Sequence, residues 1–234
     1  MNAWPEVAWV CCTFKRPHML GHLIHCFLQQ DYPREHRSLT ILDDAGEYEN
    51  QSGDGWQLVS IPLRFLSLGQ KRNAVAAMVP INTKFYCPVD DDDLYLPHAM
   101  TACAAALQDA DLAIPSKVFQ ENRPGMIVAE SEHHHHAAWG YRRWLFEKVG
   151  GYPALNMGED GEFKRAALAG GAVVADPLAL GFTPYFICTR FTETYHAHTF
   201  KGYDYRMIGD TLRKKSTLKI GPGYVQVGGQ IALL

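Results

Sequence analysis

The chain has 234 residues, a length that one α/β domain or two small domains can account for. Apolar residues make up 47% of it and charged residues 20%, which allows a sizeable buried core and excludes a disordered chain. The formal net charge of −3 excludes a strong overall attraction to nucleic acid or to an anionic membrane, although a local patch is still allowed.

The N-terminal stretch MNAWPEVAWVCC lacks the basic region and long apolar segment of a signal peptide. No run in the chain approaches the roughly 18 apolar residues that a membrane helix needs. None of the cysteines forms a C-x-x-C pair, and most lie in apolar runs, where cysteine behaves as a small hydrophobe in a reduced setting. We therefore expect a soluble, cytoplasmic protein without a transmembrane helix.

The first half of the chain alternates strand and helix patterns. Short apolar runs predict buried strands at 6–13, 39–44, 56–63 and 84–89. Helical patterns follow His18 and Gly69, and a third covers 96–110 with Pro97 in its first turn. This alternation predicts an α/β fold with a mainly parallel central sheet flanked by helices.

The second half is less regular. Strands are predicted at 111–119, 125–130 and 172–176, and residues 133–153 mix strand and helix signals. A helix is predicted to begin at Glu159 and to end at Gly170 and Gly171. The segment 196–234 is an aromatic and basic tail that becomes rich in glycine.

Ligands of parallel α/β sheets bind at the carboxyl ends of the strands. Residues 12–16, the pair Asp43–Asp44 and the run Asp90–Asp93 all follow predicted strands, so we expect them to line one crevice. Carboxylate oxygens suit Mg²⁺ and Mn²⁺, and in an extended segment Asp90 and Asp92 point the same way. The alternative is a solvated acidic turn that caps the next helix, but its place after a buried strand favours a metal site.

Three further groups each allow two interpretations. Asp44 can accept hydrogen bonds from a nucleobase or a ribose, or it can initiate a turn. Lys71 and Arg72 suit an anion or a base edge, or they form a solvated helix face. Glu159 and Asp160 can supply a general base, or they can complement the dipole of their helix.

The chain also contains histidine clusters. For His133–His136 we favour packing over a zinc site, because alternate residues of a strand point to opposite faces and no partner cluster has suitable spacing. His196 and His198 are better spaced for binding one ion, but the signal is weak.

In order along the chain, these motifs resemble the GT-A glycosyltransferases, especially the large family 2 type. The resemblance covers roughly residues 6–175. It is carried by the segments VCCTFKRPHMLGHLIHCFLQQDYP, LTILDDAG, LGQKRNAVAAMV, FYCPVDDDDLYLP and YRRWLFEKVGGYPALNMGEDGEFKRAALAGG. It implies a single domain over 1–234, with a nucleotide-sugar half (1–100), an acceptor half (101–195) and the tail.

The resemblance also implies roles. The donor, a nucleotide-sugar and most simply a UDP-sugar, is expected to contact Thr13, Phe14, Asp44, Lys71, Arg72, Asp90 and Asp91. Phe14 is expected to stack on the base and Asp44 to bond it. Asp90 and Asp92 are expected to bind Mn²⁺ or Mg²⁺, with Asp92 the safest ligand and His198 or His196 completing the shell. Asp160 is the expected base of an inverting transfer, supported by Glu159.

The chain departs from the family at several points. The usual proline–threonine–tyrosine–asparagine turn is here Cys12–Lys15, and Ala45–Gly46 replaces the common glycine–serine. Lys15 adds a positive charge near the expected donor that the usual turn lacks. The four consecutive aspartates leave the metal register uncertain by one residue.

Two other functions remain open from sequence. A nucleotidyltransferase typically has a glycine-rich loop after its first strand, whereas here no glycine occurs before Gly21. A non-catalytic module that binds a sugar nucleotide or a glycan is the second. The acceptor is also open: a glycan, a small molecule or, as in some phage enzymes, hydroxymethylated DNA. DNA could be held by the basic residues of the tail, which are Arg206, Arg213, Lys214, Lys215 and Lys219, or these residues could simply be solvated.

Overall fold

The computed structural model describes residues 4–122, 125–131, 134–189, 219–221, 224–227 and 230–233. Several predictions lie outside these residues. They concern His133, His196, His198, Arg206, Arg213, Lys214, Lys215 and the side chain of Lys219.

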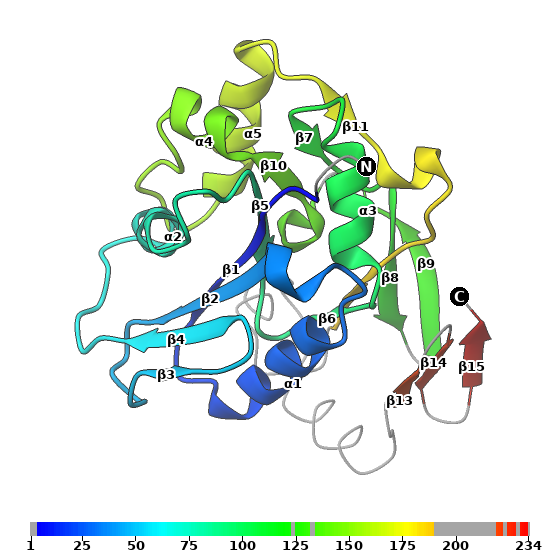
Figure 1. The fold of residues 1–234 in the computed structure, drawn as a ribbon, viewed down its shortest axis with the longest axis horizontal. Helices are drawn as coiled ribbons and strands as arrows, with labels where there is room; N and C mark the ends of the chain where they lie inside the picture. Colours follow the sequence, from blue (N-terminus) through cyan, green and yellow to red (C-terminus); the bar gives the residue numbers. More distant parts are fainter. Residues whose placement is uncertain are drawn as a thin grey trace, which may run out of the picture.

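An eight-stranded sheet forms the centre of the molecule (Figure 1). Its strand order is β11-β7-β10-β5-β1-β2-β4-β3. The strands are β1 (Val7–Thr13), β2 (Arg37–Asp43), β3 (Gln51–Ser52), β4 (Trp56–Ser60), β5 (Phe85–Val89), β7 (Leu112–Ala113), β10 (Gly140–Arg142) and β11 (Val174–Ala175). Strands β5, β1, β2 and β4 run parallel, which confirms the predicted mainly parallel sheet.

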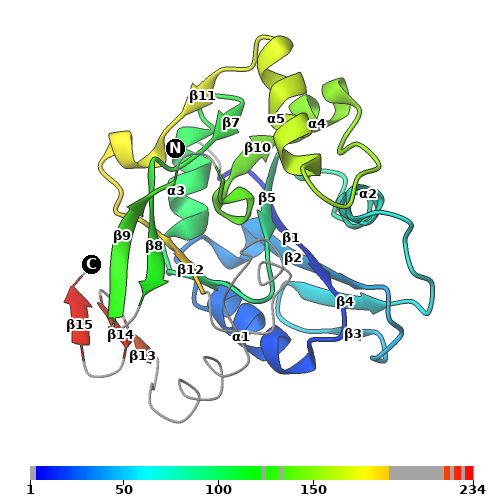
Figure 2. The ribbon, with the colours of Figure 1, turned by 180° about the vertical axis from the view of Figure 1, so that it is seen from behind.

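Helices cover both faces of this sheet. On one face α1 (Pro17–Leu28) and α3 (Ala99–Ala106) pack against Val7, Trp9 and Cys11 of β1. On the other face α2 (Leu68–Ala77), α4 (Arg143–Val149) and α5 (Glu159–Ala169) pack against Ala8 and Val10. Figure 2 shows the same layers from behind. Because successive strand residues point to opposite faces, a continuous apolar run is what a sheet buried on both sides requires.

Two smaller sheets complete the described structure. One has the order β6-β12-β8-β9 and consists of β6 (Leu94–Tyr95), β8 (Lys117–Asn122), β9 (Gly125–Glu130) and β12 (Phe186–Cys188). The other is antiparallel and consists of β13 (Lys219–Gly221), β14 (Tyr224–Val227) and β15 (Gln230–Leu233). Short 3₁₀ turns lie at Arg34–His36, His136–Ala138 and Pro177–Leu180.

Two local predictions were wrong. Pro97 is not in the first turn of α3, because His98 is the residue that precedes the helix and the Pro97 carbonyl accepts a hydrogen bond from the Asp31 amide. The predicted strand 111–119 is two strands, β7 and β8, which belong to different sheets. An apolar run does not reveal this kind of break, because both pieces are buried. Within the described residues, no helix is both long and apolar enough to cross a membrane.

Candidate active site

The carboxyl ends of β1, β2 and β5 meet at one edge of the central sheet. Thr13 pairs with Asp43 across β1 and β2, and Cys11 pairs with Val89 across β1 and β5. Asp44 therefore follows β2, and Asp90 follows β5, at the edge where the β1–α1 turn begins. This is the crevice that parallel α/β sheets use for ligands.

The acidic run forms a turn and not the expected extended segment. One carboxylate oxygen from each of Asp90, Asp92 and Asp93 lies within 4.8 Å of the others. We call these three residues the acidic triad. Asp91 faces elsewhere and accepts hydrogen bonds from Thr13 Oγ1 at 2.6 Å and Arg16 at 2.8 Å. The turn therefore places Asp93 with Asp90 and Asp92, and it leaves Asp91 to hold Thr13 and Arg16. Alternation of side chains along an extended segment did not predict this arrangement.

The triad suits a divalent cation. All three ligand groups are carboxylate oxygens, which hard cations such as Mg²⁺ and Mn²⁺ prefer. Burial and the neighbouring Asp92 and Asp90 carboxylates raise the pKa of Asp93 well above its usual range. Burial likewise raises the pKa of Asp91, and the Arg16 cation opposes this shift. A dication would offset the excess negative charge that these neighbours share.

Two arginines contact the acidic turn in the part of the chain that the structure describes. One Arg16 nitrogen lies 2.8 Å from Asp91 Oδ1 and 2.8 Å from Asp92 Oδ2. Arg72 lies 3.7 Å from Asp90 Oδ1. Thr189, the last residue described before 190–218, donates from its amide to Asp93 and from its hydroxyl to the Asp92 carbonyl.

Arg72 also joins the triad to the start of α5. Its Nε donates to Glu159 Oε1 at 3.1 Å, while its other end faces Asp90. Burial would lower the pKa of Arg72, but the Asp90 carboxylate and other negative groups raise it, so the guanidinium is always charged. The run Asp90–Asp93 and the acidic start of α5, which the sequence presented as separate sites, are thereby brought together through one cation.

The two acidic residues at the start of α5 differ in their surroundings. Glu159 is buried and paired with Arg72, and burial raises its pKa while Arg72 opposes the shift. Asp160 is half-buried and accepts a 2.7 Å hydrogen bond from the Gly161 amide. Among the described residues no cation is within ion-pair distance of Asp160. Its carboxylate is therefore the more available of the two for a proton transfer.

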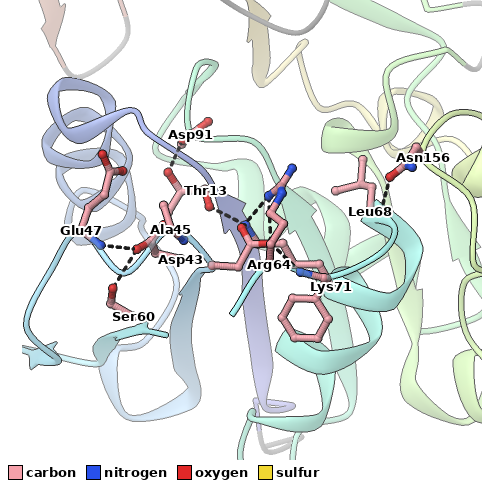
Figure 3. A network of polar contacts seen from close by, with 12 residues as sticks. Thr13, Asp43, Ala45, Glu47, Ser60, Arg64, Leu68, Lys71, Asp91 and Asn156 are labelled. Carbon is pink, nitrogen blue, oxygen red and sulfur yellow. Dashed lines mark hydrogen bonds and ion pairs between the residues drawn. The ribbon is translucent and has the colours of Figure 1, made fainter. Parts of the chain in front are cut away.

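A second site lies around Asp44. Lys71 donates both to Asp44 and to the Thr13 carbonyl, and Thr13 donates to Asp91 of the acidic run (Figure 3). The Asp44 side chain is fully buried and forms ion pairs with Lys71 and Arg64. An Arg64 guanidinium nitrogen lies 2.7 Å from Asp44 Oδ1. Burial would raise the pKa of Asp44, but Lys71, the Phe65 amide and Arg64 together hold it below its ordinary value. The Arg64 guanidinium lies 3.8 Å above the centre of the Phe14 ring. Phe14 and Asp44 thus face one planar group, as a base site requires, although here that group is Arg64.

Asp43 and Lys71 serve the fold of this site. Asp43 accepts hydrogen bonds from the Ala45 and Glu47 amides and from Ser60 Oγ, and so shapes the turn after β2 (Figure 3). Lys71 is buried and donates to Asp44 and to the Thr13 carbonyl, so it links α2 to the ends of β1 and β2. Both of these Lys71 contacts are made to the protein itself.

A loop over residues 150–158 holds α2 against α5. Asn73 donates to the Tyr152 carbonyl and accepts from the Tyr152 amide, both at 2.8 Å. The Gly69 amide donates to the Leu155 carbonyl, and a Cβ added at Gly69 would lie 1.8 Å from the Pro153 oxygen. Glycine is therefore required at position 69, because only a residue without a side chain allows this close approach. The loop fixes Arg72 relative to Glu159.

Two described histidines of the 133–136 cluster, His135 and His136, pack against neighbouring side chains. His136 is buried in a 3₁₀ turn and lies 2.8 Å from the Tyr152 hydroxyl. Burial and the Arg72 charge lower its pKa well below the usual range, so it is neutral. His135 lies in a tilted contact with the Phe186 ring, with 5.8 Å between the ring centres. The segment is not the strand that the argument from alternation assumed.

Sequence reasoning placed Arg16 and Asp93 in the crevice without giving either a role of its own, and it missed Arg64. Both Arg16 and Asp93 lie in spans that were expected at the ends of strands. A turn at residues 90–93, in place of the assumed extended segment, would have pointed to Asp93. Arg64 gave no signal, because a single arginine in an irregular loop has no recognisable pattern.

The fold is similar to that of several solved structures. The S. aureus TarS 1-349 chain in complex with UDP-GlcNAc superimposes with a TM-score of 0.64 at 16% identity, over 85% of this chain and 61% of that chain. Mannosyltransferase PcManGT from Pyrobaculum calidifontis, in complex with GDP-Man and Mn²⁺, gives 0.59 at 15% identity, over 84% of this chain and 60% of that chain. Both are GT-A glycosyltransferases.

This chain has the GT-A fold. Along the chain, Asp44 follows β2, the acidic triad follows β5, and Glu159 begins α5. The chain spans about three fifths of the TarS 1-349 chain, at 61% coverage. No family model matches the sequence, and no curated protein matches it.

Proposed function

We propose that this chain is a metal-dependent glycosyltransferase that moves a sugar from a nucleotide donor to an acceptor hydroxyl. One observation carries the proposal: Arg72 connects the acidic triad after β5 to the acidic start of α5. A site for a dication and a diphosphate thus lies next to a carboxylate that can take a proton. Two separate acidic turns without this link would not bring both halves of a transfer reaction together.

The donor lies between the acidic triad and Phe14 in this proposal. Phe14 offers a face for the base, and Asp44 offers oxygens for its N–H groups. Thr13 and Arg72 lie on the diphosphate side, Asp90 would meet the diphosphate through the dication, and Asp91 holds Thr13 in position through its hydrogen bond. Lys71 contributes by keeping Asp44 charged. We propose a UDP-sugar as the donor, and the UDP-GlcNAc bound to TarS supports this choice. Because PcManGT binds GDP-Man, GDP-sugars are the donors to test beside UDP-sugars.

Because Arg64 covers Phe14 and pairs with Asp44, the base must displace it or share the ring with it. The Arg64 side chain is half exposed, so it can leave into solvent. Lys15 Nζ lies 5.4 Å from the same ring and adds a second cation near the donor.

Asp90 and Asp92, with Asp93 beside them, would hold Mn²⁺ or Mg²⁺. When bound, such an ion would supply the positive charge that neutralises the leaving diphosphate. Asp160 takes the proton from the acceptor O–H as that oxygen bonds to the anomeric carbon, and the bond from that carbon to the diphosphate breaks. Attack opposite the leaving group inverts the anomeric carbon. Glu159 keeps Arg72 in place beneath this site.

His198 remains a proposed additional metal ligand. Thr189 contacts Asp92 and Asp93, so the chain enters residues 190–218 directly at the triad. A His198→Ala variant that binds Mn²⁺ as tightly as the parent protein would remove this residue from the proposal.

The proposed acceptor is a glycan or small-molecule hydroxyl, with a hydroxymethylated DNA base as the second candidate. The DNA candidate depends on Arg206, Arg213, Lys214, Lys215 and Lys219, which the tail supplies. DNA affinity that falls steeply with salt and disappears when these five residues become Gln would support DNA. Affinity that is unchanged in this variant would exclude the tail as the contact.

The test of the function combines binding and turnover. A thermal-shift screen of UDP- and GDP-sugars with Mn²⁺ identifies the donor, and acceptor trials then follow release of the nucleoside diphosphate. Failure to transfer sugar or to hydrolyse any bound donor would favour a non-catalytic binding module. Transfer of a nucleotidyl group from a nucleoside triphosphate would favour a nucleotidyltransferase.

A further inference from the structure

Arg16 is placed to act on metal binding at the acidic triad. It precedes α1 directly, and one of its nitrogens donates to both Asp91 and Asp92 at 2.8 Å. The Arg16 side chain is 19% exposed, whereas the Asp91 and Asp92 side chains are 2% and 4% exposed. A charge-assisted contact between largely buried groups is among the stronger hydrogen bonds of a protein.

The two carboxylates that Arg16 contacts have different roles. Asp91 accepts from Arg16 at one oxygen and from Thr13 at the other, so it anchors the guanidinium to the end of β1. Asp92 belongs to the acidic triad, and Arg16 bonds its Oδ2. The same carboxylate is therefore offered both to Arg16 and to a dication.

The backbone beside Arg16 supports a defined position for this side chain. Lys15 has a φ of 56°, in the left-handed region that a residue with a side chain rarely adopts. Such a conformation persists where contacts on both sides hold it. Here Phe14 lies against Arg64, and Arg16 lies against Asp91 and Asp92.

We propose that Arg16 is a displaceable counter-ion, which competes with the dication for Asp92 and, once released, pairs with the donor diphosphate while Asp91 keeps it in place. Two cations on one carboxylate repel each other, so Arg16 weakens metal binding when no nucleotide is present. A diphosphate supplies the negative charge that accommodates both, and the planar guanidinium suits phosphate oxygens. Metal and nucleotide then bind cooperatively. The competition for Asp92 does not depend on the proposed function, whereas the pairing of Arg16 with a diphosphate rests on it.

The test measures Mn²⁺ affinity from the free-ion EPR signal, without nucleotide and then with UDP or GDP. Arg16→Met is expected to bind Mn²⁺ alone about tenfold more tightly than the parent protein. Its gain in Mn²⁺ affinity on adding the nucleotide should be at least about tenfold smaller. Arg16→Lys keeps the charge and should stay near the parent value. Arg34→Met is the matched control, because it removes one arginine from the exposed pair with Asp54.

The Mn²⁺ affinities test the competition for Asp92 separately from the pairing with a diphosphate. Equal or weaker binding of Mn²⁺ alone by Arg16→Met would overturn the competition, as would an absence of Mn²⁺ binding in every variant. Arg16→Gln replaces Arg16→Met if the latter does not fold, as judged by circular dichroism. If Mn²⁺ affinity shifts as expected but no variant binds UDP or GDP, the competition stands, while the pairing with a diphosphate and the proposed function both fail.

Discussion

Arg72 donates from Nε to Oε1 of Glu159 at 3.1 Å, and this contact ties α2 to the start of α5. The same guanidinium lies 3.7 Å from Asp90 Oδ1, at the carboxyl end of β5, and its central carbon lies 5.9 Å from the centre of the Tyr152 ring. Asn73, one residue further along α2, donates to the Tyr152 carbonyl and accepts from the Tyr152 amide. The relative position of the two acidic sites thus depends on a single turn of α2.

Replacing Arg72 with Met should lower kcat about 10²- to 10³-fold, the usual effect of removing one preorganised charged donor. Without the Arg72 charge, the pKa of the buried Glu159 rises further, and Asp90 loses a contact. Steady-state transfer assays check this. Arg143→Met is the control, since its pair with Glu147 lies on the surface. A kcat within threefold of the parent value would remove Arg72 from the site.

Asp160→Asn should reduce transfer about 10²- to 10⁴-fold, the range for loss of a general base. The Kd of the nucleotide should change little, because Asp160 lies at the start of α5 and not at the Asp44 site. Isothermal titration with UDP and a transfer assay measure the two effects separately. Near-full turnover of Asp160→Asn, together with an inactive Glu159→Gln, would assign the base to Glu159.

The stability contributed by Asp44 should depend on pH. Its folded-state pKa is lowered, so the stabilisation is present above the unfolded pKa of about 3.9 and is lost as pH falls below that value. Asp44→Asn leaves Lys71 buried without its charged partner, which should cost about 3–5 kcal/mol at pH 7.

Urea unfolding of the parent protein and Asp44→Asn at pH 7 and near pH 3 measures this dependence. The difference between the two proteins should shrink at the lower pH. Asp54→Asn is the exposed control and should cost at most about 1 kcal/mol, since both Asp54 and its partner Arg34 are exposed. A difference for Asp44→Asn that is the same at both pH values would contradict the assignment.

Gly69→Ala should destabilise the fold by about 1–3 kcal/mol or more, because the added methyl group would meet the Pro153 carbonyl oxygen. Gly21→Ala is the matched control within α1, where nothing lies within 4 Å of the added Cβ. The control should gain about 0.5–1 kcal/mol from the higher helix propensity of alanine. Thermal unfolding compares the two variants, and equal melting temperatures would show that the loop 150–158 can move away.

The sequence predicted the sheet and the edge where the site lies, because buried parallel strands give apolar runs and their ends are marked by charged residues. It also placed the start of α5 at Glu159, where glycine and acidic residues mark a helix end. It did not predict which of the four aspartates lies outside the triad, because the turn at 90–93 depends on contacts with Thr13 and Arg16, which are distant in sequence. Arg64 and Asn73 act through tertiary contacts that no local pattern encodes.

The most direct test of the central claim is the affinity for UDP, or for GDP if UDP does not bind, with Mn²⁺ and with EDTA, in the parent protein and in Asp92→Ala. We expect Mn²⁺ to increase the affinity of the parent protein at least about tenfold and to have no effect on a folded Asp92→Ala variant, because the triad then lacks one of its three carboxylates. Nucleotide binding that is equally tight in EDTA, or a full Mn²⁺ effect in Asp92→Ala, would contradict the account.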